Sequence, residues 1–272
     1  MQAFTIEHKG RVYQGHIPES FNELTADQLL QLCRYYNGQT LLPKARLHFL
    51  LHLLGWKPYA WRRNRALMAV PAQQLHFLSQ ALNWAFAPST LTRQLLPRVR
   101  VGLRFFYGPK DFFGNGIFDE VVTAIGKSIS YKKAEYEADR DRLLAELAAT
   151  MYRPRKWYWP LISLLPWLNN GDQRQKFNEH LIKPNAKLLS KLPKEQLHAI
   201  LLFFEGCQAH WKAVAPDAFT STEGSSDDKF GWEKFYVAMA GPKFGNIHQV
   251  GNTYYTNILI HLQSELENKP KK

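Results

Sequence analysis

The chain has 272 residues, of which 45% are hydrophobic and 14% aromatic, and it carries a formal net charge of +12. These values are those of a chain that buries a core as one large domain or two smaller ones, and they exclude wholesale disorder. The excess of 35 basic over 23 acidic residues favours acidic or phosphate-rich partners, because such partners are attracted by long-range electrostatics.

The N-terminal half is predicted to begin with a β-hairpin. Residues 4–7 and 11–15 flank the turn, and Val12 and Tyr13 favour strand. Thr25 and Gln28 then form a capping box that opens a helix, which Asn37-Gly38 ends. Further helices are expected over residues 43–54 and 71–86, whereas the prolines and glycines of residues 88–116 indicate broken helix and ordered loop.

The C-terminal half has the apolar periodicity of helices throughout. Residues 117–130 and 131–151 predict two helices or one kinked helix, with a charged, exposed face over 132–142. Further helices are expected over residues 172–190, 193–213, 231–240 and 251–267.

These elements predict a mainly α fold, a multi-helix domain with a short N-terminal β-hairpin. Residues 1–110 would form the hairpin and a basic helical half, and residues 111–272 a helical half with a mobile loop near 219–229. A single continuous domain is the alternative.

Positive charge is concentrated in one region. No acidic residue occurs between Asp27 and Asp111, and twelve basic residues do. This interval accounts for the whole net charge, because the rest of the chain holds 23 basic and 23 acidic residues. The region is either a contact surface for a polyanion or a solvated face.

Three segments place arginine next to aromatic residues, which is the combination that nucleic-acid binders and interface hot spots share. The candidate contact residues are Trp61, Arg62, Arg63 and Arg65, then Arg98, Arg100 and Arg104, and then Arg153, Arg155, Trp157 and Trp159. For residues 153–168 three interpretations stay open: a membrane-interface loop, a partner-docking segment, and a proline-rich loop folded over the core.

Each sequence pattern that could indicate catalysis, cofactor binding or metal binding is incomplete or has a better structural explanation. Gly126-Lys127-Ser128 lacks the earlier glycine of a phosphate-binding loop, because position 121 is Val. His48 and His52 have metal-ligand spacing without a third ligand, and boundary histidines of an amphipathic helix are the better interpretation. Asp111, Asp119 and Glu120 could form a carboxylate cluster for acid–base chemistry or for binding a cation. The preferred interpretation is that Asp119 and Glu120 lie in an exposed first helical turn, where the helix dipole favours them. We therefore expect no catalytic, cofactor-binding or metal-binding residue, and a protein that is not an enzyme.

Cys33 and Cys207 lie in apolar helical patterns and are expected to be buried small hydrophobes. The first residues do not have the pattern of a signal peptide. The longest apolar-looking run, 157–168, contains two prolines and is too short to span a bilayer. A cytoplasmic location is therefore expected, with no transmembrane segment.

Three stretches together resemble tail-region proteins of tailed bacteriophages and prophages: 118–154 (FDEVV…MYRP), 191–206 (KLPKEQLHAILLFFEG) and 230–267 (FGWEKF…SELE). The resemblance is to helical tail-assembly chaperones and virion-associated proteins. It implies assembly with other proteins in a multi-subunit structure, located in the host cytoplasm or the virion. The function expected from the sequence is a non-enzymatic assembly or scaffolding protein, and a nucleic-acid-binding protein that uses the basic region 28–110 is the alternative.

Overall fold

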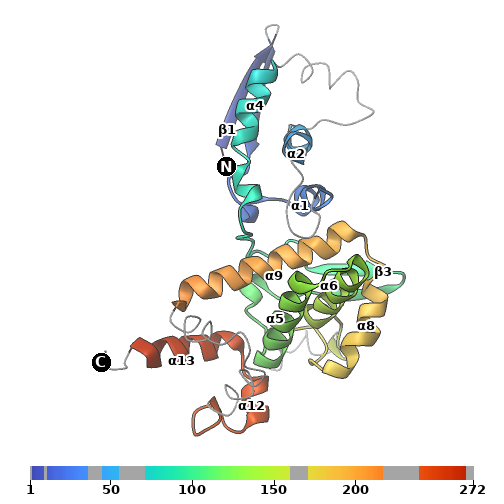
Figure 1. The fold of residues 1–272 in the computed structure, drawn as a ribbon, viewed down its shortest axis with the longest axis vertical. Coiled ribbons are helices and arrows are strands. Elements are labelled where there is room, and N and C mark those ends of the chain that lie inside the picture. Colours follow the sequence, from blue (N-terminus) through green and yellow to red (C-terminus); the bar gives the residue numbers. More distant parts are fainter. Residues whose placement is uncertain are drawn as a thin grey trace. The chain divides into compact units, whose positions relative to one another are not determined.

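The computed structural model describes residues 2–8, 11–35, 45–54, 71–159, 171–216 and 239–267. Over these residues the fold is mainly α, as predicted, with two small antiparallel sheets (Figure 1). The chain divides into two compact units, Met1–Leu91 with Pro193–Gly206, and Thr92–Leu192 with Cys207–Lys272. These units differ from the predicted halves, because residues distant in sequence pack together.

The first unit opens with the predicted hairpin, in which β1 (Gln2–His8) pairs with β2 (Arg11–Ile17). The predicted capping box is confirmed: the Gln28 amide N–H donates to Thr25 Oγ1 at 3.3 Å, and the Thr25 N–H donates to Gln28 Oε1 at 2.9 Å. The helical elements of this unit are α1 (Ala26–Cys33), α2 (Ala45–Leu53), α4 (Ala72–Gln80), the short 3-10 helices Phe21–Glu23 and Asn83–Phe86, and α9 (Lys194–Val214) as far as Gly206.

The helix predicted over 71–86 is shorter than expected. It ends at Gln80, and a 3-10 turn follows. This turn brings the Trp84 indole to Pro18, where its Nε1 donates to the carbonyl at 2.8 Å, and packs the ring edge-on against Phe21 at 4.9 Å. These contacts stabilise the turn in place of a further helical turn.

The second unit combines a three-stranded antiparallel sheet with packed helices. The strands are β3 (Arg98–Val101), β4 (Arg104–Tyr107) and β5 (Arg153–Pro154), in that order. Its helix α6 packs against both α5 and α8 (Figure 1). The helical elements are Asp111–Phe113 (3-10), α5 (Phe118–Lys133), α6 (Glu137–Met151), Glu179–Leu181 (3-10), α8 (Ile182–Leu189), the end of α9, α12 (Ile247–Asn252) and α13 (Tyr255–Glu267).

Two predictions for this unit are wrong in part. Residues 88–116 contain the β3–β4 hairpin, where broken helix and loop were expected. Residues 172–178 are not helical, because their backbone pairs with the segment after α6. The N–H of Lys156 donates to the Gln173 carbonyl, and the N–H of Gln175 donates to the Pro154 carbonyl, both at 2.9 Å.

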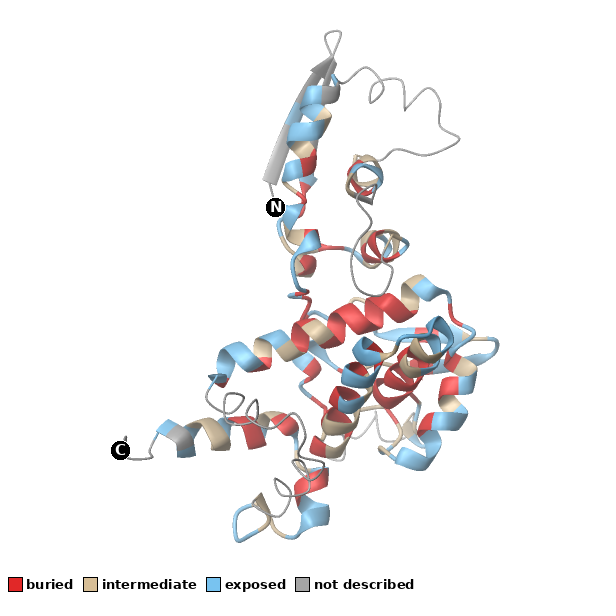
Figure 2. Cartoon of the chain, in the orientation of Figure 1, coloured by how far each residue is buried: buried red, intermediate tan, exposed pale blue. Residues whose placement is uncertain are grey.

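The core of the second unit centres on the C-terminal half of α6, where every residue from Leu144 to Met151 is buried (Figure 2). Polar groups there are paired. Lys127 of α5 forms an ion pair with Glu146, and Thr150 Oγ1 donates to the Glu146 carbonyl at 2.9 Å. The N-terminal half carries the predicted charged, exposed residues. No helix in the described part of the chain is long and apolar enough to cross a membrane.

Both cysteines are free and buried, as predicted. Burial raises the pKa of both thiols, and a nearby carboxylate adds to the effect, Glu195 at Cys33 and Asp111 at Cys207. In the folded protein the thiols therefore stay protonated at a pH where unfolded thiols ionise.

We expect this difference to make the protein less stable at alkaline pH. The stabilisation is complete below the unfolded thiol pKa of about 8.5 and falls above it, by about 1.4 kcal/mol per pH unit for each thiol. Melting temperatures measured from about pH 7 to 10 should fall above that point. In the double variant Cys33→Ala, Cys207→Ala the melting temperature should fall less steeply with pH. An equally steep fall would show that the two thiols do not cause the loss of stability.

Candidate functional site

The β3–β4 hairpin presents basic side chains on one face of the sheet. Successive side chains of a strand point to opposite faces. Val99 of β3 and its cross-strand partner Phe106 are buried, and Arg98 and Arg100 are exposed. Arg104 is exposed at the start of β4, but its cross-strand partner is Val101, so the alternation places it on the face of Val99 and Phe106.

Phe105 lies between the arginines of this face. It is opposite Arg100 in the register, and its side chain is 40% exposed. The guanidinium carbons of Arg98 and Arg100 each lie 5.5 Å from its ring centroid, within cation–π distance. Leu103, in the turn, is 89% exposed. Among the described residues, no carboxylate forms an ion pair with any of the three arginines of the hairpin, so their charge is available to a partner.

The segment after β5 also exposes basic and aromatic side chains. Arg155 is exposed, and the Trp157 side chain is 84% exposed with Tyr158 packed edge-on against it at 5.5 Å. The ammonium of Lys156 lies 5.9 Å from the ring centroid of Trp159. The remainder of the predicted docking segment, 160–168, lies outside the described residues, as do Trp61, Arg62, Arg63, Arg65 and the predicted loop at 219–229.

Arg153, the remaining predicted contact residue, is buried, so it does not belong to the exposed surface. Its side chain is 7% exposed and its Nη2 donates to Glu120 Oε2 at 2.9 Å. The expectation of an exposed Glu120 is also wrong, because this carboxylate is completely buried. The sequence shows that Glu120 lies in a first helical turn, but it does not show that another segment of the same chain covers this side chain.

Arg174 is the second partner of Glu120 and is also completely buried. Its Nη1 donates to Glu120 Oε1 at 2.6 Å and to the Met151 carbonyl at 2.9 Å. Its Nη2 donates to the Asn115 carbonyl at 3.1 Å, and its Nε donates to Asp172 Oδ1 at 3.0 Å. We call Glu120, Arg153, Asp172 and Arg174 the buried charge cluster.

The two arginines of the cluster differ in how far their charge is compensated. Burial works to lower the pKa of Arg174, but the charges of Glu120 and Asp172 outweigh burial and raise it. At Arg153 burial lowers the pKa, and attraction to Glu120 offsets only part of this effect. Two positive and two negative charges balance, and the interactions join the start of α5, the end of α6 and the segment 172–174.

Two consecutive phenylalanines beside the cluster adopt left-handed backbone conformations, with φ of 57° at Phe112 and 58° at Phe113. Each such residue costs about 1–3 kcal/mol and persists only where its surroundings hold it. Here the Phe113 ring is buried near Arg174, whose guanidinium carbon lies 6.0 Å from its centroid, and Phe112 packs against His210 at 4.8 Å. The turn therefore directs one ring inward and leaves the other 45% exposed.

The remaining sequence candidates take part in local contacts. His48 stacks on Tyr35 at 5.5 Å, and His52 Nε2 lies 3.2 Å from Asp27 Oδ2. Asp111 accepts a hydrogen bond from the Gln94 backbone N–H at 2.7 Å. Within the described ranges, no group of three or more histidine, cysteine or acidic side chains is placed to hold a metal ion.

Comparison with known proteins adds no relative: no family model, no curated protein and no solved structure matches this chain. The hairpin surface and the buried charge cluster are therefore the features that bear on the class of this protein.

Proposed function

We propose that this protein is a non-enzymatic assembly protein that binds an acidic protein partner on its β3–β4 hairpin. The observation that carries the proposal is that three arginines of the hairpin, Arg98, Arg100 and Arg104, are exposed without carboxylate partners among the described residues. The exposed Leu103 in the turn adds apolar area beside these charges, and Trp157 is a further exposed aromatic side chain of the same unit. Arginine and tryptophan with apolar neighbours are the composition of interface hot spots.

The geometry of Phe105 favours protein over nucleic acid as the partner. Nucleic-acid platforms use aromatic faces that are open to stack against bases. The guanidinium groups of Arg98 and Arg100 both lie over the Phe105 ring, so a base would have to displace an arginine. Carboxylates need no open ring, because they accept hydrogen bonds directly from the guanidinium edges.

We propose a phage tail or virion as the larger assembly, because three stretches of the sequence resemble phage tail-assembly and virion-associated proteins. The partner in this proposal is an acidic surface of another subunit of a tail or virion structure. A nucleic acid bound through the same arginines is the alternative.

Binding of model polyanions should depend on the hairpin arginines. We expect the full chain to bind a fluorescent poly-glutamate peptide more tightly than an oligothymidylate of equal charge. The variant Arg98→Gln, Arg100→Gln, Arg104→Gln should lose about tenfold in affinity for the peptide, since each charge contact contributes a few tenths to 1 kcal/mol. Fluorescence anisotropy measures the affinity of each protein for the peptide and for the oligothymidylate.

The matched control removes three exposed lysines elsewhere in the same unit, with Lys183→Gln, Lys187→Gln and Lys191→Gln, and should retain the affinity. Equal losses in both triple variants would show that only net charge matters, which contradicts the proposal. Tighter binding to the oligothymidylate, with a salt slope that falls by about 2 in the hairpin variant, would establish the nucleic-acid alternative.

A further inference from the structure

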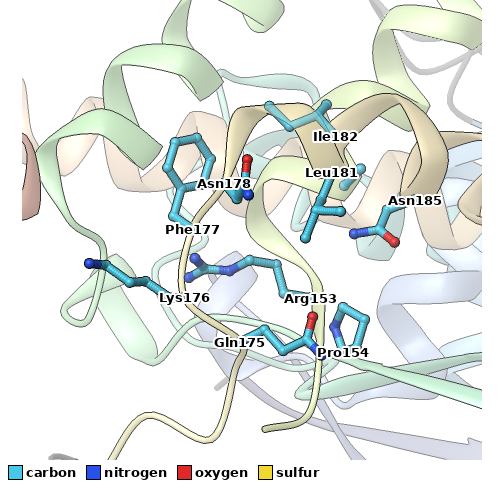
Figure 3. A pocket seen from close by; sticks show the side chains of 10 residues that line it. Arg153, Pro154, Gln175, Lys176, Phe177, Asn178, Leu181, Ile182 and Asn185 are labelled. Carbon is cyan, nitrogen blue, oxygen red and sulfur yellow. The ribbon is translucent and has the colours of Figure 1, made fainter.

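The three-stranded sheet of the second unit is covered at one edge and open at the other. At the β5 edge, the N–H of Lys156 donates to the Gln173 carbonyl and the N–H of Gln175 donates to the Pro154 carbonyl. Figure 3 shows Gln175 beside Pro154 at this place. The opposite edge is β3, which pairs with β4 on one side. Within the described part of the chain, β3 is therefore the strand that can accept a further partner.

The register shows which backbone groups of β3 point away from β4. In an antiparallel pair, residues that exchange hydrogen bonds with the residue opposite alternate with residues that do not. The Gly108 N–H donates to the Pro97 carbonyl at 3.0 Å, so this pair is of the first kind. Counting along the register from Pro97, Arg98 and Arg100 are of the second kind. Their N–H and C=O groups point outward, and no hydrogen bond joins these groups to another described residue.

The side chains of the same two residues give this edge a positive charge. Arg98 and Arg100 lie on one face of the sheet, with the Phe105 ring within cation–π distance of both. Arg100 Nε also donates to the Gly102 carbonyl at 2.7 Å, which holds this guanidinium beside the strand. The open edge therefore combines unpaired main-chain groups with fixed cationic side chains.

A second copy of this edge is a poor partner. Antiparallel pairing of two β3 strands about an axis at Val99 would place Arg98 of one copy opposite Arg100 of the other. Like charges directly opposite each other destabilise a sheet, and charged side chains on outer strands protect against self-pairing. A strand with carboxylates at alternate positions is complementary instead, because side chains two residues apart lie on the same face.

We propose that β3 binds an extended acidic segment of the partner protein as an additional strand of the sheet. The outward N–H and C=O groups of Arg98 and Arg100 pair with the backbone of the segment, and their guanidinium groups pair with two carboxylates spaced two residues apart. Strand addition takes its affinity from main-chain hydrogen bonds and its specificity from alternate side chains. This inference rests on the proposed function and describes how the acidic partner is recognised.

Methylated peptides test main-chain pairing on the unmodified full chain. The parent is a fluorescent, end-blocked hexapeptide of alternating glutamate and valine, and two derivatives carry N-methyl groups on either the three glutamates or the three valines. Successive N–H groups of a strand point to opposite edges, so one derivative keeps the N–H groups that face β3 and the other does not. By fluorescence anisotropy, one should bind as the parent does and the other about tenfold more weakly. Equal affinity of the two derivatives would overturn the proposal.

A proline variant tests the same edge from the side of the protein. Arg100→Pro removes an outward N–H together with the side-chain charge, and proline is tolerated in an outer strand where its nitrogen faces solvent. Arg100→Gln is the matched control, because it removes the charge alone. The proline variant should bind the parent peptide about fivefold more weakly than the glutamine variant. Melting temperatures check that both variants are folded, and equal affinity of the folded variants would contradict the proposal.

The outcomes separate this inference from the proposed function. If the parent peptide binds through the hairpin arginines but both derivatives bind alike, the proposed function stands and strand addition is wrong. If the triple variant Arg98→Gln, Arg100→Gln, Arg104→Gln binds the parent as tightly as the unmodified chain, the proposed function itself fails. A dimer in analytical ultracentrifugation that is lost in Arg100→Pro and kept in Arg100→Gln would show that a second copy occupies β3, which also overturns the inference.

Discussion

Replacing Glu120 with glutamine is expected to lower the free energy of unfolding by about 3–5 kcal/mol, the usual cost of removing one partner from a buried ion pair. The change leaves Arg153 and Arg174 in the protein interior with Asp172 as the only remaining negative charge of the cluster. Glutamine has nearly the same shape as glutamate, so the loss would report on charge rather than on packing. Urea denaturation followed by tryptophan fluorescence measures it.

An exposed pair provides the control. Arg142 Nη2 lies 2.8 Å from Asp139 Oδ1, and both side chains are about half exposed, at 62% and 47%. Asp139→Asn should change stability by about 0.5 kcal/mol or less, because water and salt screen the pair. If Glu120→Gln cost no more than Asp139→Asn, the cluster would contribute little to stability.

Replacing Gly206 with alanine is expected to destabilise the first unit by about 3 kcal/mol. A Cβ atom at this position would lie 2.6 Å from the carbonyl carbon of Leu91 and closer still to its oxygen and nitrogen. These are backbone atoms, which cannot move aside as a flexible side chain does. Ser89 Oγ holds the same segment against α9 by donating to the Leu202 carbonyl at 2.7 Å.

Gly126→Ala is the matched control, because Gly126 also lies within a helix but has no atom within 4 Å of its Cβ position. Alanine there should stabilise the protein by about 0.5–1 kcal/mol through helix propensity. Thermal denaturation of the two variants should therefore give changes of opposite sign. A stabilising effect of Gly206→Ala would show that the Leu91 segment does not pack against α9 in solution.

Local sequence signals determined several elements of this protein. The hairpin of β1 and β2, the capping box of Thr25 and Gln28, and the helix over residues 194–214 follow from strand propensity, capping chemistry and apolar periodicity. The exposure of Arg98 and Arg100 is also a local property, since alternation along β3 separates them from the buried Val99. These features depend on neighbours within a few residues.

Tertiary structure alone decided the positions of the buried charges. Glu120 occupies a first helical turn that looks solvent-exposed in the sequence, and Arg174 lies in a segment whose helical pattern is overridden by pairing with residues 154 and 156. Their interaction joins positions 54 residues apart. Tertiary structure also decided the burial of the Arg153 Nε, which has no hydrogen-bond partner among the described residues, and the close approach of Leu91 to Gly206. Burial depends on which distant segments cover a side chain, and a local pattern contains no information about them.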